Sequence, residues 1–139
     1  MRAHQTDPDL VVAASDIGLC ISRDAGATWT IETDGLHGAH CYAIAFSGDD
    51  IIVSASADFF AAEGRIYRRP IKPDGSLAAV EGGTPPWIEG VVDTGCIATN
   101  GASIAVADRA GNLYSSDDFG RAWSCRSTGL PVPSGVFLC

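Results

Sequence analysis

Short runs of apolar residues alternate with turn-forming residues along the whole chain. The clearest runs span residues 9–15, 50–56 and 103–108, and Gly, Asp, Asn or Pro residues bound such runs. This pattern is typical of short β-strands joined by tight turns. No stretch keeps the apolar spacing of a helix over the roughly 11 residues that a helix would need. The pattern therefore predicts an all-β fold.

An internal repeat indicates which all-β fold this is. The pattern Ser-x-Asp-x-Gly-x-x-Trp occurs at residues 22–29 and again at 116–123, which is 94 positions later, or twice 47. A third unit is expected halfway between them, where Ile66-Tyr67 lies 47 positions before Leu113-Tyr114 and residues 70–75 replace the acidic turn. Each unit contains about four predicted strands, and this number and period are typical of a β-propeller blade. A single β-sandwich is the alternative, but it does not predict matched turns two periods apart.

The repeat predicts three four-stranded blades within one domain, at approximately residues 1–32, 41–81 and 94–127. Residues 134–139 are interpreted as a further innermost strand that closes the first blade by pairing with residues 9–15. Three blades do not close a ring, so either two chains combine into six blades or the chain belongs to a longer protein. We favour the homodimer, because the sequence begins with Met and ends on a complete strand.

The repeated motif resembles the Asp box, or BNR repeat, of sialidases and of many noncatalytic propellers, among them sortilin-type receptors and photosystem assembly factors. The residues that carry the resemblance are Ser22, Asp24, Gly26, Trp29, Ser116, Asp118, Gly120 and Trp123. The two glycines suit a positive φ, the carboxylates suit the N–H groups of their own turn, and the tryptophans suit packing between sheets. The resemblance places the boxes on the face away from any active site, so we interpret them as structural rather than catalytic.

Composition and charge narrow the classes of partner that the protein is expected to bind. Hydrophobic residues make up 46% of the chain and charged residues 19%, and 17 Asp and Glu against 9 Lys and Arg give a formal net charge of -8. This balance argues against nucleic acid and an anionic membrane, because both need a basic surface. Neither a bilayer-spanning run nor a signal pattern is visible, so a cytoplasmic location is expected. Five cysteines without a CxxC pair are interpreted as free thiols rather than a disulfide framework or zinc site.

One fragment raises the hypothesis of a sialidase-like glycosidase. Tyr67-Arg68-Arg69-Pro70 resembles the Tyr/Phe-Arg-x-Pro signature of sialidases. That signature precedes the first Asp box in the family, whereas here it follows one. Because the remaining arginines form no convincing triad, glycoside hydrolysis is kept as the alternative and not as the main interpretation.

The loops opposite the boxes form the candidate binding face. An acidic residue follows each second strand, and a ring of such carboxylates would hold a cation or a basic peptide; alternatively, Asp simply suits the first position of a turn. Histidines, with Asp34 nearby, form a weak metal-ligand set, and incidental histidines are the preferred interpretation. We predict neither a metal nor a cofactor. The candidate residues of this face are Asp16, Asp58, Asp108, His37, His40 and Trp87.

Two loops are unusually apolar for exposed connections, at residues 59–62 and 85–88. Exposed aromatic residues mark interfaces or ligand contacts, although Trp87 equally suits folding back onto its blade. Taken together, the sequence predicts a noncatalytic propeller scaffold that binds a protein, a peptide or a glycan. The alternatives are a sialidase-like hydrolase and a structural fragment of a larger propeller protein.

Overall fold

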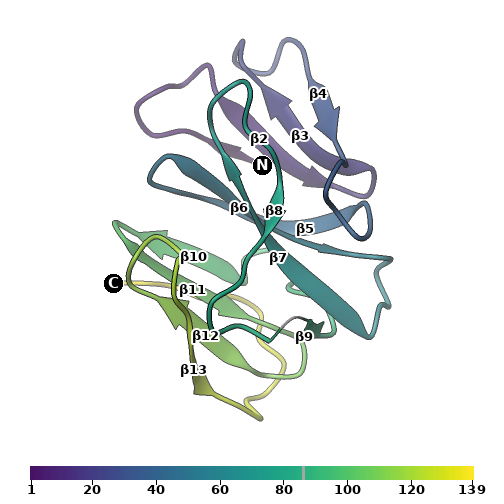
Figure 1. The fold of residues 1–139 in the computed structure, drawn as a ribbon, viewed down its shortest axis with the longest axis vertical. Helices are drawn as coiled ribbons and strands as arrows, with labels where there is room; N and C mark the ends of the chain where they lie inside the picture. The colour runs from purple at the N-terminus through teal and green to yellow at the C-terminus, as the bar shows by residue number, and fades with distance from the viewer. Residues whose placement is uncertain (86) are drawn as a thin grey trace.

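The computed structural model describes residues 1–85 and 87–139 and consists of three antiparallel sheets stacked face to face (Figure 1). The first sheet contains β1 (Arg2–Ala3), β2 (Val11–Ser15), β3 (Gly18–Ser22) and β4 (Thr30–Glu32). The second contains β5 (His40–Ser47), β6 (Asp50–Ser56), β7 (Glu63–Pro70), β8 (Ala78–Ala79) and β9 (Ile88–Glu89). The third contains β10 (Ile97–Asn100), β11 (Ser103–Ala107), β12 (Leu113–Ser116) and β13 (Ser124–Ser127).

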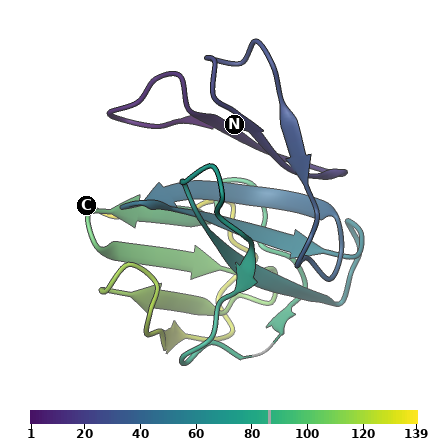
Figure 2. The same ribbon diagram turned by 45° about the horizontal axis from the view of Figure 1, so that its top comes forward.

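The middle sheet lies between the other two, as both views show (Figures 1 and 2). Strand β6 is therefore apolar on both faces, because successive side chains of a strand point in opposite directions. Ile51 and Val53 pack in the core shared with the first sheet, whereas Ile52 packs in the core shared with the third. Two separate hydrophobic cores hold the three sheets together.

Strand register places the repeated positions at equivalent points of each sheet. Ser22 of β3 pairs with β2, Arg69 of β7 pairs with β6, and Ser116 of β12 pairs with β11. These three residues are 47 positions apart in sequence. All three side chains lie on the face that each sheet turns toward the start of the chain, so the period seen in the sequence is also a period in space.

The outer edge of the second sheet differs from the expected single strand. Strand β8 pairs with Tyr67 and Arg68, and the separate strand β9 pairs with Glu63 and Gly64 at the other end of β7. Strand β9 was not predicted from sequence, because two residues are too few for a periodic signal. Both short strands together cover the outer edge of β7.

The predicted pairing of residues 134–139 with residues 9–15 is wrong within one chain. Among the described residues, this segment forms no strand, and the backbone N–H of Val136 donates to Gly95 O at 2.9 Å. Strand β1 already takes the edge of β2, through the pairs Arg2 with Val12 and Ala3 with Val11. Because β1 satisfies these backbone groups, β2 has no free edge at these residues for the C-terminal segment of the same chain.

Two further findings concern the cysteine thiols and the search for a membrane-spanning helix. All five cysteines are free thiols, and burial raises the pKa of the Cys41 thiol to about 12. In the described parts of the chain, the structure contains no helix that is long and apolar enough to cross a membrane.

Candidate functional site

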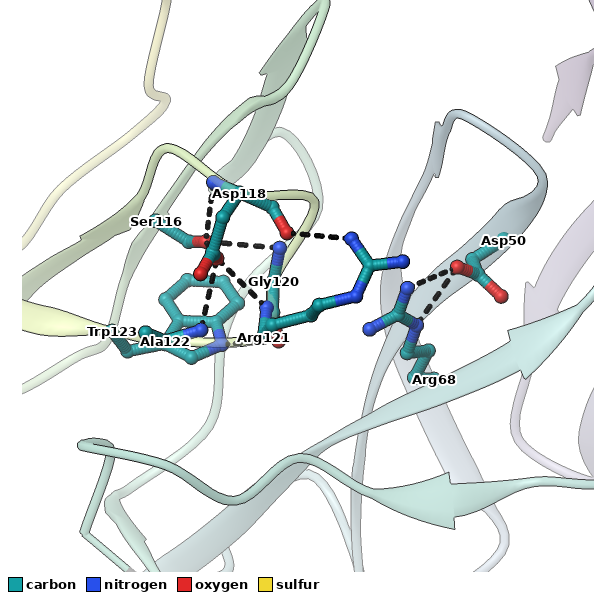
Figure 3. A network of polar contacts seen from close by, with 8 residues as sticks. All are labelled: Asp50, Arg68, Ser116, Asp118, Gly120, Arg121, Ala122 and Trp123. Carbon is teal, nitrogen blue, oxygen red and sulfur yellow. Dashed lines mark hydrogen bonds and ion pairs between the residues drawn. The ribbon is translucent and has the colours of Figure 1, made fainter.

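The two turns that carry the Ser-x-Asp-x-Gly-x-x-Trp motif lie at one end of the stack and are built in the same way; each is called a box. Ser116 Oγ donates to Asp118 Oδ1 at 2.8 Å and accepts from Gly120 N at 2.9 Å, and Asp118 Oδ1 accepts from Ala122 N at 2.9 Å (Figure 3). Trp123 Nε1 donates to Gly120 O at 2.9 Å, which fixes the indole against the turn. Gly120 has a φ of 78°, a conformation that costs glycine little. The box is a self-contained set of hydrogen bonds.

The first box repeats this geometry. Asp24 accepts from Thr28 N at 2.8 Å and from Ser22 Oγ at 2.8 Å, and Gly26 has a φ of 93°. Hydrogen bonds from the Thr28 hydroxyl and its backbone N–H, together with Ser22, lower the Asp24 pKa to about 2. Hydrogen bonds from Ala122 N and Ser116 lower the pKa of Asp118 as well. Both carboxylates therefore stay ionised and engaged within their own turns, which fits a structural role.

In the turn after β7, Arg69 occupies the position that Ser22 and Ser116 occupy in the turns of the other two sheets. Arg69 donates from Nη1 to Lys72 O at 2.6 Å, and it also donates to Pro70 O. Its other nitrogens pair with both carboxylate oxygens of Glu32 at 2.7 and 2.9 Å. Sequence reasoning did not identify this role, because nothing in the local sequence shows that Arg69 faces the first sheet.

The opposite end of the stack carries a compact aromatic cluster on the loop that joins β6 to β7. Phe59 packs edge to face on Phe60 with ring centroids 5.1 Å apart and lies 5.9 Å from the ring of Tyr42. The guanidinium of Arg109 lies over the Phe59 ring at 4.3 Å and donates to Phe59 O at 2.9 Å. Asp93 holds Arg109 through two hydrogen bonds of 2.7 and 2.9 Å. Three segments that are distant in sequence thus fix one aromatic loop.

The same loop is also fixed from within. Asp58 Oδ1 accepts from Phe60 N at 2.7 Å, Ser56 Oγ donates to Asp58 O at 2.8 Å, and Gly90 N donates to Ala62 O at 2.6 Å. Nevertheless, the Phe60 side chain is 88% exposed. Phe59 and Phe60 together present apolar surface to solvent on a loop that hydrogen bonds hold in place.

A second aromatic group lies at the same end of the stack. His37 Nδ1 lies 2.8 Å from Tyr67 Oη, and the ring of His37 meets Trp87 edge to face at 4.6 Å. The guanidinium of Arg65 lies over the Trp87 ring at 5.2 Å. Burial and the nearby Arg65 charge lower the pKa of His37, which favours the neutral ring. Trp87 therefore packs on this group while its side chain stays partly exposed.

The expected ring of carboxylates is not what the structure contains. Asp108 is fully buried, and it accepts from Asn112 N at 2.9 Å and from Asn112 Nδ2 at 3.0 Å. Asp58 and Asp16 are both exposed, but the Asp58 carboxylate accepts a hydrogen bond within its own loop. Two of the three carboxylates therefore serve their turns, which is the alternative that the sequence left open. The reason is local: a carboxylate that begins a tight turn is the nearest acceptor for the turn's N–H groups.

His37 and His40 each contact a tyrosine hydroxyl. His37 bonds to Tyr67, whereas His40 Nδ1 lies 3.4 Å from the hydroxyl of Tyr42. Within residues 1–85 and 87–139, no three His, Cys, Asp or Glu side chains are grouped closely enough to hold a metal ion. Each histidine ring is therefore oriented by its own tyrosine partner and not by the other histidine.

Sequence reasoning singled out the apolar loop at residues 59–62 but missed the residues that support it. Tyr42, Asp93 and Arg109 lie on three different segments, so no local pattern connects them. The available signal was the pair of adjacent phenylalanines between two predicted strands. That signal indicated an interface, and the structure adds the rigid support and the exposure.

The three antiparallel sheets, together with a β-propeller structural neighbour, place the chain in the class of β-propeller folds. One solved structure with this fold, described as "YCF48 bound to D1 peptide", matches with a TM-score of 0.62 and 17% sequence identity. The match covers 88% of this chain and 39% of that one, so this chain spans about two fifths of the length of its structural neighbour. No family model and no curated protein matches the sequence.

Proposed function

We propose that this protein is a noncatalytic β-propeller binding module whose loop face binds a segment of another protein. The observation that carries the proposal is Phe60, exposed at the tip of a loop that three other segments hold in place. Ordering a loop before binding reduces the entropy that association costs. Exposed aromatic side chains beside an arginine are also the residue types enriched at the centres of protein interfaces.

The structural neighbour supports a peptide as the class of ligand. YCF48, which shares the β-propeller fold, is bound to a D1 peptide in its solved structure. A glycan remains the second candidate, because the exposed rings of Phe60 and Trp87 offer faces for sugars as well. Two aromatic groups, each beside an arginine, suit a partner that brings both apolar side chains and carboxylates.

The test compares two exposed phenylalanines at opposite ends of the stack. Wild-type protein is used to select binders from a random-peptide phage library and from a glycan array. Phe60→Ser is expected to weaken selected peptides by roughly tenfold or more, as at an interface hot spot. The matched control is Phe119→Asn, at the box end, because Asn tolerates the φ of 60° at that position.

Each outcome decides between the candidates. The proposal is supported if Phe60→Ser no longer binds the selected peptides while Phe119→Asn still binds them. Binding of glycans alone replaces the peptide with a carbohydrate. Peptides that bind both variants equally well, or a library that yields no binders, contradict a binding site at the Phe60 loop.

A sialidase-like activity gains no support from the geometry. Arg68 and Arg69 point to opposite faces of β7, where Arg68 pairs with Asp50 and Arg69 pairs with Glu32 (Figure 3 draws the Arg68 pair). Tyr67 is buried and bonded to His37. We expect no turnover of a fluorogenic sialoside; turnover that disappears in Arg68→Ala would establish the hydrolase instead.

We further propose that the three sheets are three propeller blades, at residues 1–32, 41–81 and 94–127, with the two boxes acting as Asp boxes. A second copy of the chain would then complete a six-bladed ring. The alternative is a fragment of a larger propeller, in which further blades of the same chain would take that place.

A further inference from the structure

We propose that Arg65 is the side chain of the loop face that selects a carboxylate of the bound segment. This inference rests on the proposed peptide-binding function and deepens it, because it names the charge that the partner brings and the residue that recognises it. The class of ligand is a peptide with an acidic side chain or a free C-terminal carboxylate. Arg65 is then a residue that determines specificity, whereas Phe60 contributes apolar contact.

Arg65 differs from the other arginines that the fold shields from solvent. Four arginines are at least partly buried, and three of them pair with a carboxylate: Arg68 with Asp50, Arg69 with Glu32 and Arg109 with Asp93. Arg65 forms no ion pair with the described residues, and its Nε is buried without a hydrogen-bond partner among them. A partly buried charge without a counter-ion is unfavourable, so an anion bound at this guanidinium would be stabilising.

A row of aromatic residues holds the Arg65 guanidinium in position. The guanidinium lies over the Trp87 ring at 5.2 Å, and Trp87 meets His37 edge to face at 4.6 Å. His37 is in turn fixed to Tyr67 Oη by its backbone N–H at 3.0 Å and by its Nδ1 at 2.8 Å. A guanidinium stacked on an aromatic ring keeps its N–H groups free in its own plane, which suits a carboxylate. Trp87 is 39% exposed, so a ligand reaches this stack from solvent.

The carboxylates near Arg65 do not take the place of this ligand. Glu63 lies two positions earlier, so its side chain is on the same face of β7, but it forms no ion pair with Arg65 in the described part of the chain. Glu63 pairs across the strands with Glu89, and both are exposed. Exposed carboxylates neutralise a neighbouring cation only weakly, and they repel an incoming carboxylate. Removal of the Glu63 charge should therefore strengthen the binding of an acidic peptide.

The experiment uses peptides that are selected from a random phage library on the full wild-type chain and then synthesised. Each peptide is made in three forms: as selected, with Asp and Glu replaced by Asn and Gln, and with an amidated C-terminus. Isothermal titration calorimetry measures the three affinities. Loss of the carboxylate that Arg65 binds should weaken binding roughly tenfold, because a charge-assisted hydrogen bond is lost. The form that loses affinity identifies the carboxylate as a side chain or as the C-terminus.

Four variants assign the preference for a carboxylate to a residue. Arg65→Gln should abolish the preference and leave the affinity for the uncharged form unchanged, whereas Arg65→Lys keeps a charge without the planar guanidinium and should retain part of it. Glu63→Gln should strengthen binding of the acidic form roughly twofold. The matched control is Arg121→Gln at the box end, because the Arg121 guanidinium also lies over an aromatic ring, that of Phe119 at 6.0 Å. This control should bind every form as the wild-type protein does.

The results separate the role of Arg65 from peptide binding as such. A preference for a carboxylate that Arg65→Gln loses and Arg121→Gln keeps supports the inference. Equal affinity of the wild-type protein for all three forms, or a preference that both Arg65 variants keep in full, overturns it. Peptides that Phe60→Ser no longer binds but Arg65→Gln binds unchanged would preserve the loop-face proposal alone, whereas a library that yields no binders contradicts both.

Discussion

At the scale of single residues, hydrogen bonds within each turn explain the repeated motif. Asp24 and Asp118 accept from backbone N–H groups three or four positions ahead, while Ser22 and Ser116 each link the carboxylate to the glycine N–H. These contacts are local in sequence, so the residue types alone predicted the acceptors and the need for glycine. Phe60 is the opposite case, because its exposure depends on a loop that distant residues hold.

The pH dependence of stability tests the box carboxylates. The Asp24 pKa is about 2 in the folded protein, below its ordinary value of 3.8. Its contribution to stability is therefore fully present above about pH 4 and is lost as the pH falls toward 2. Asp24→Asn should lower the melting temperature by a few degrees at pH 7 and should flatten the decline in stability between pH 4 and 2.

The control for this prediction is Asp16→Asn, because Asp16 is exposed in the turn between β2 and β3 and lies outside the motif. It should change the melting temperature little at either pH. Thermal unfolding followed by circular dichroism from pH 2 to 7 provides the measurement. If the difference in melting temperature between wild type and Asp24→Asn were the same at pH 2 as at pH 7, the role assigned to the carboxylate would be contradicted.

At the scale of elements, the middle turn shows how a lost motif is replaced. Residues 70–75 lack the acidic box, and Arg69 donates to carbonyl groups of this turn from the position that Ser22 and Ser116 occupy elsewhere. Glu32 of β4 neutralises the guanidinium from the first sheet. The sequence predicted that this unit keeps its strand and changes its turn. It did not reveal the substitute, because the Arg69 partner is 37 residues away.

The Arg69–Glu32 pair should contribute measurably to stability. Arg69 is 2% exposed, so Glu32→Gln leaves a buried charge without its counter-ion and should cost about 2–3 kcal/mol in the free energy of unfolding. Urea unfolding at one fixed protein concentration measures this cost. In a double-mutant cycle, Glu32→Gln combined with Arg69→Met should cost less than the two single changes added together.

A matched exposed pair provides the comparison. Arg126 and Asp117 form an ion pair at 3.4 Å on the surface of the third sheet. Because solvent screens this pair, Asp117→Asn should change the free energy of unfolding by less than about 0.5 kcal/mol. Equal effects at the two pairs, or strict additivity in the cycle, would show that Arg69 does not depend on Glu32.

At the scale of the whole molecule, two exposed apolar features matter most, the Phe60 loop and the side chains of Trp29 and Ile31 in the first sheet. Both are exposed in one chain, and neither is explained by the folding of that chain. The net charge of -8 per chain gives two copies no long-range attraction. Burial of apolar area must therefore supply the affinity of the proposed dimer.

The salt dependence of the dimer affinity tests whether apolar burial or charge dominates the contact between the copies. Copies of like charge repel, and ions screen the repulsion over roughly 10 Å at 0.1 M ionic strength. Raising sodium chloride from low to moderate concentration should therefore tighten the dimer, as measured by sedimentation at a concentration near the dissociation constant. Weakening by salt would indicate that ion pairs, and not apolar contacts, dominate the contact between the two copies.

The sequence by itself determined the features that depend on neighbours along the chain. These are the all-β class, the period of 47 residues, the turn chemistry of Asp24 and Asp118, and the propeller fold, because strand alternation and tight turns are written in short stretches. The tertiary structure alone decided which carboxylates are buried, that β1 takes the edge of β2, and that Arg109 and Tyr42 support Phe59. It also decided that Trp123 is covered while Trp29 is not. Such contacts join segments far apart in the chain, so no local pattern specifies them.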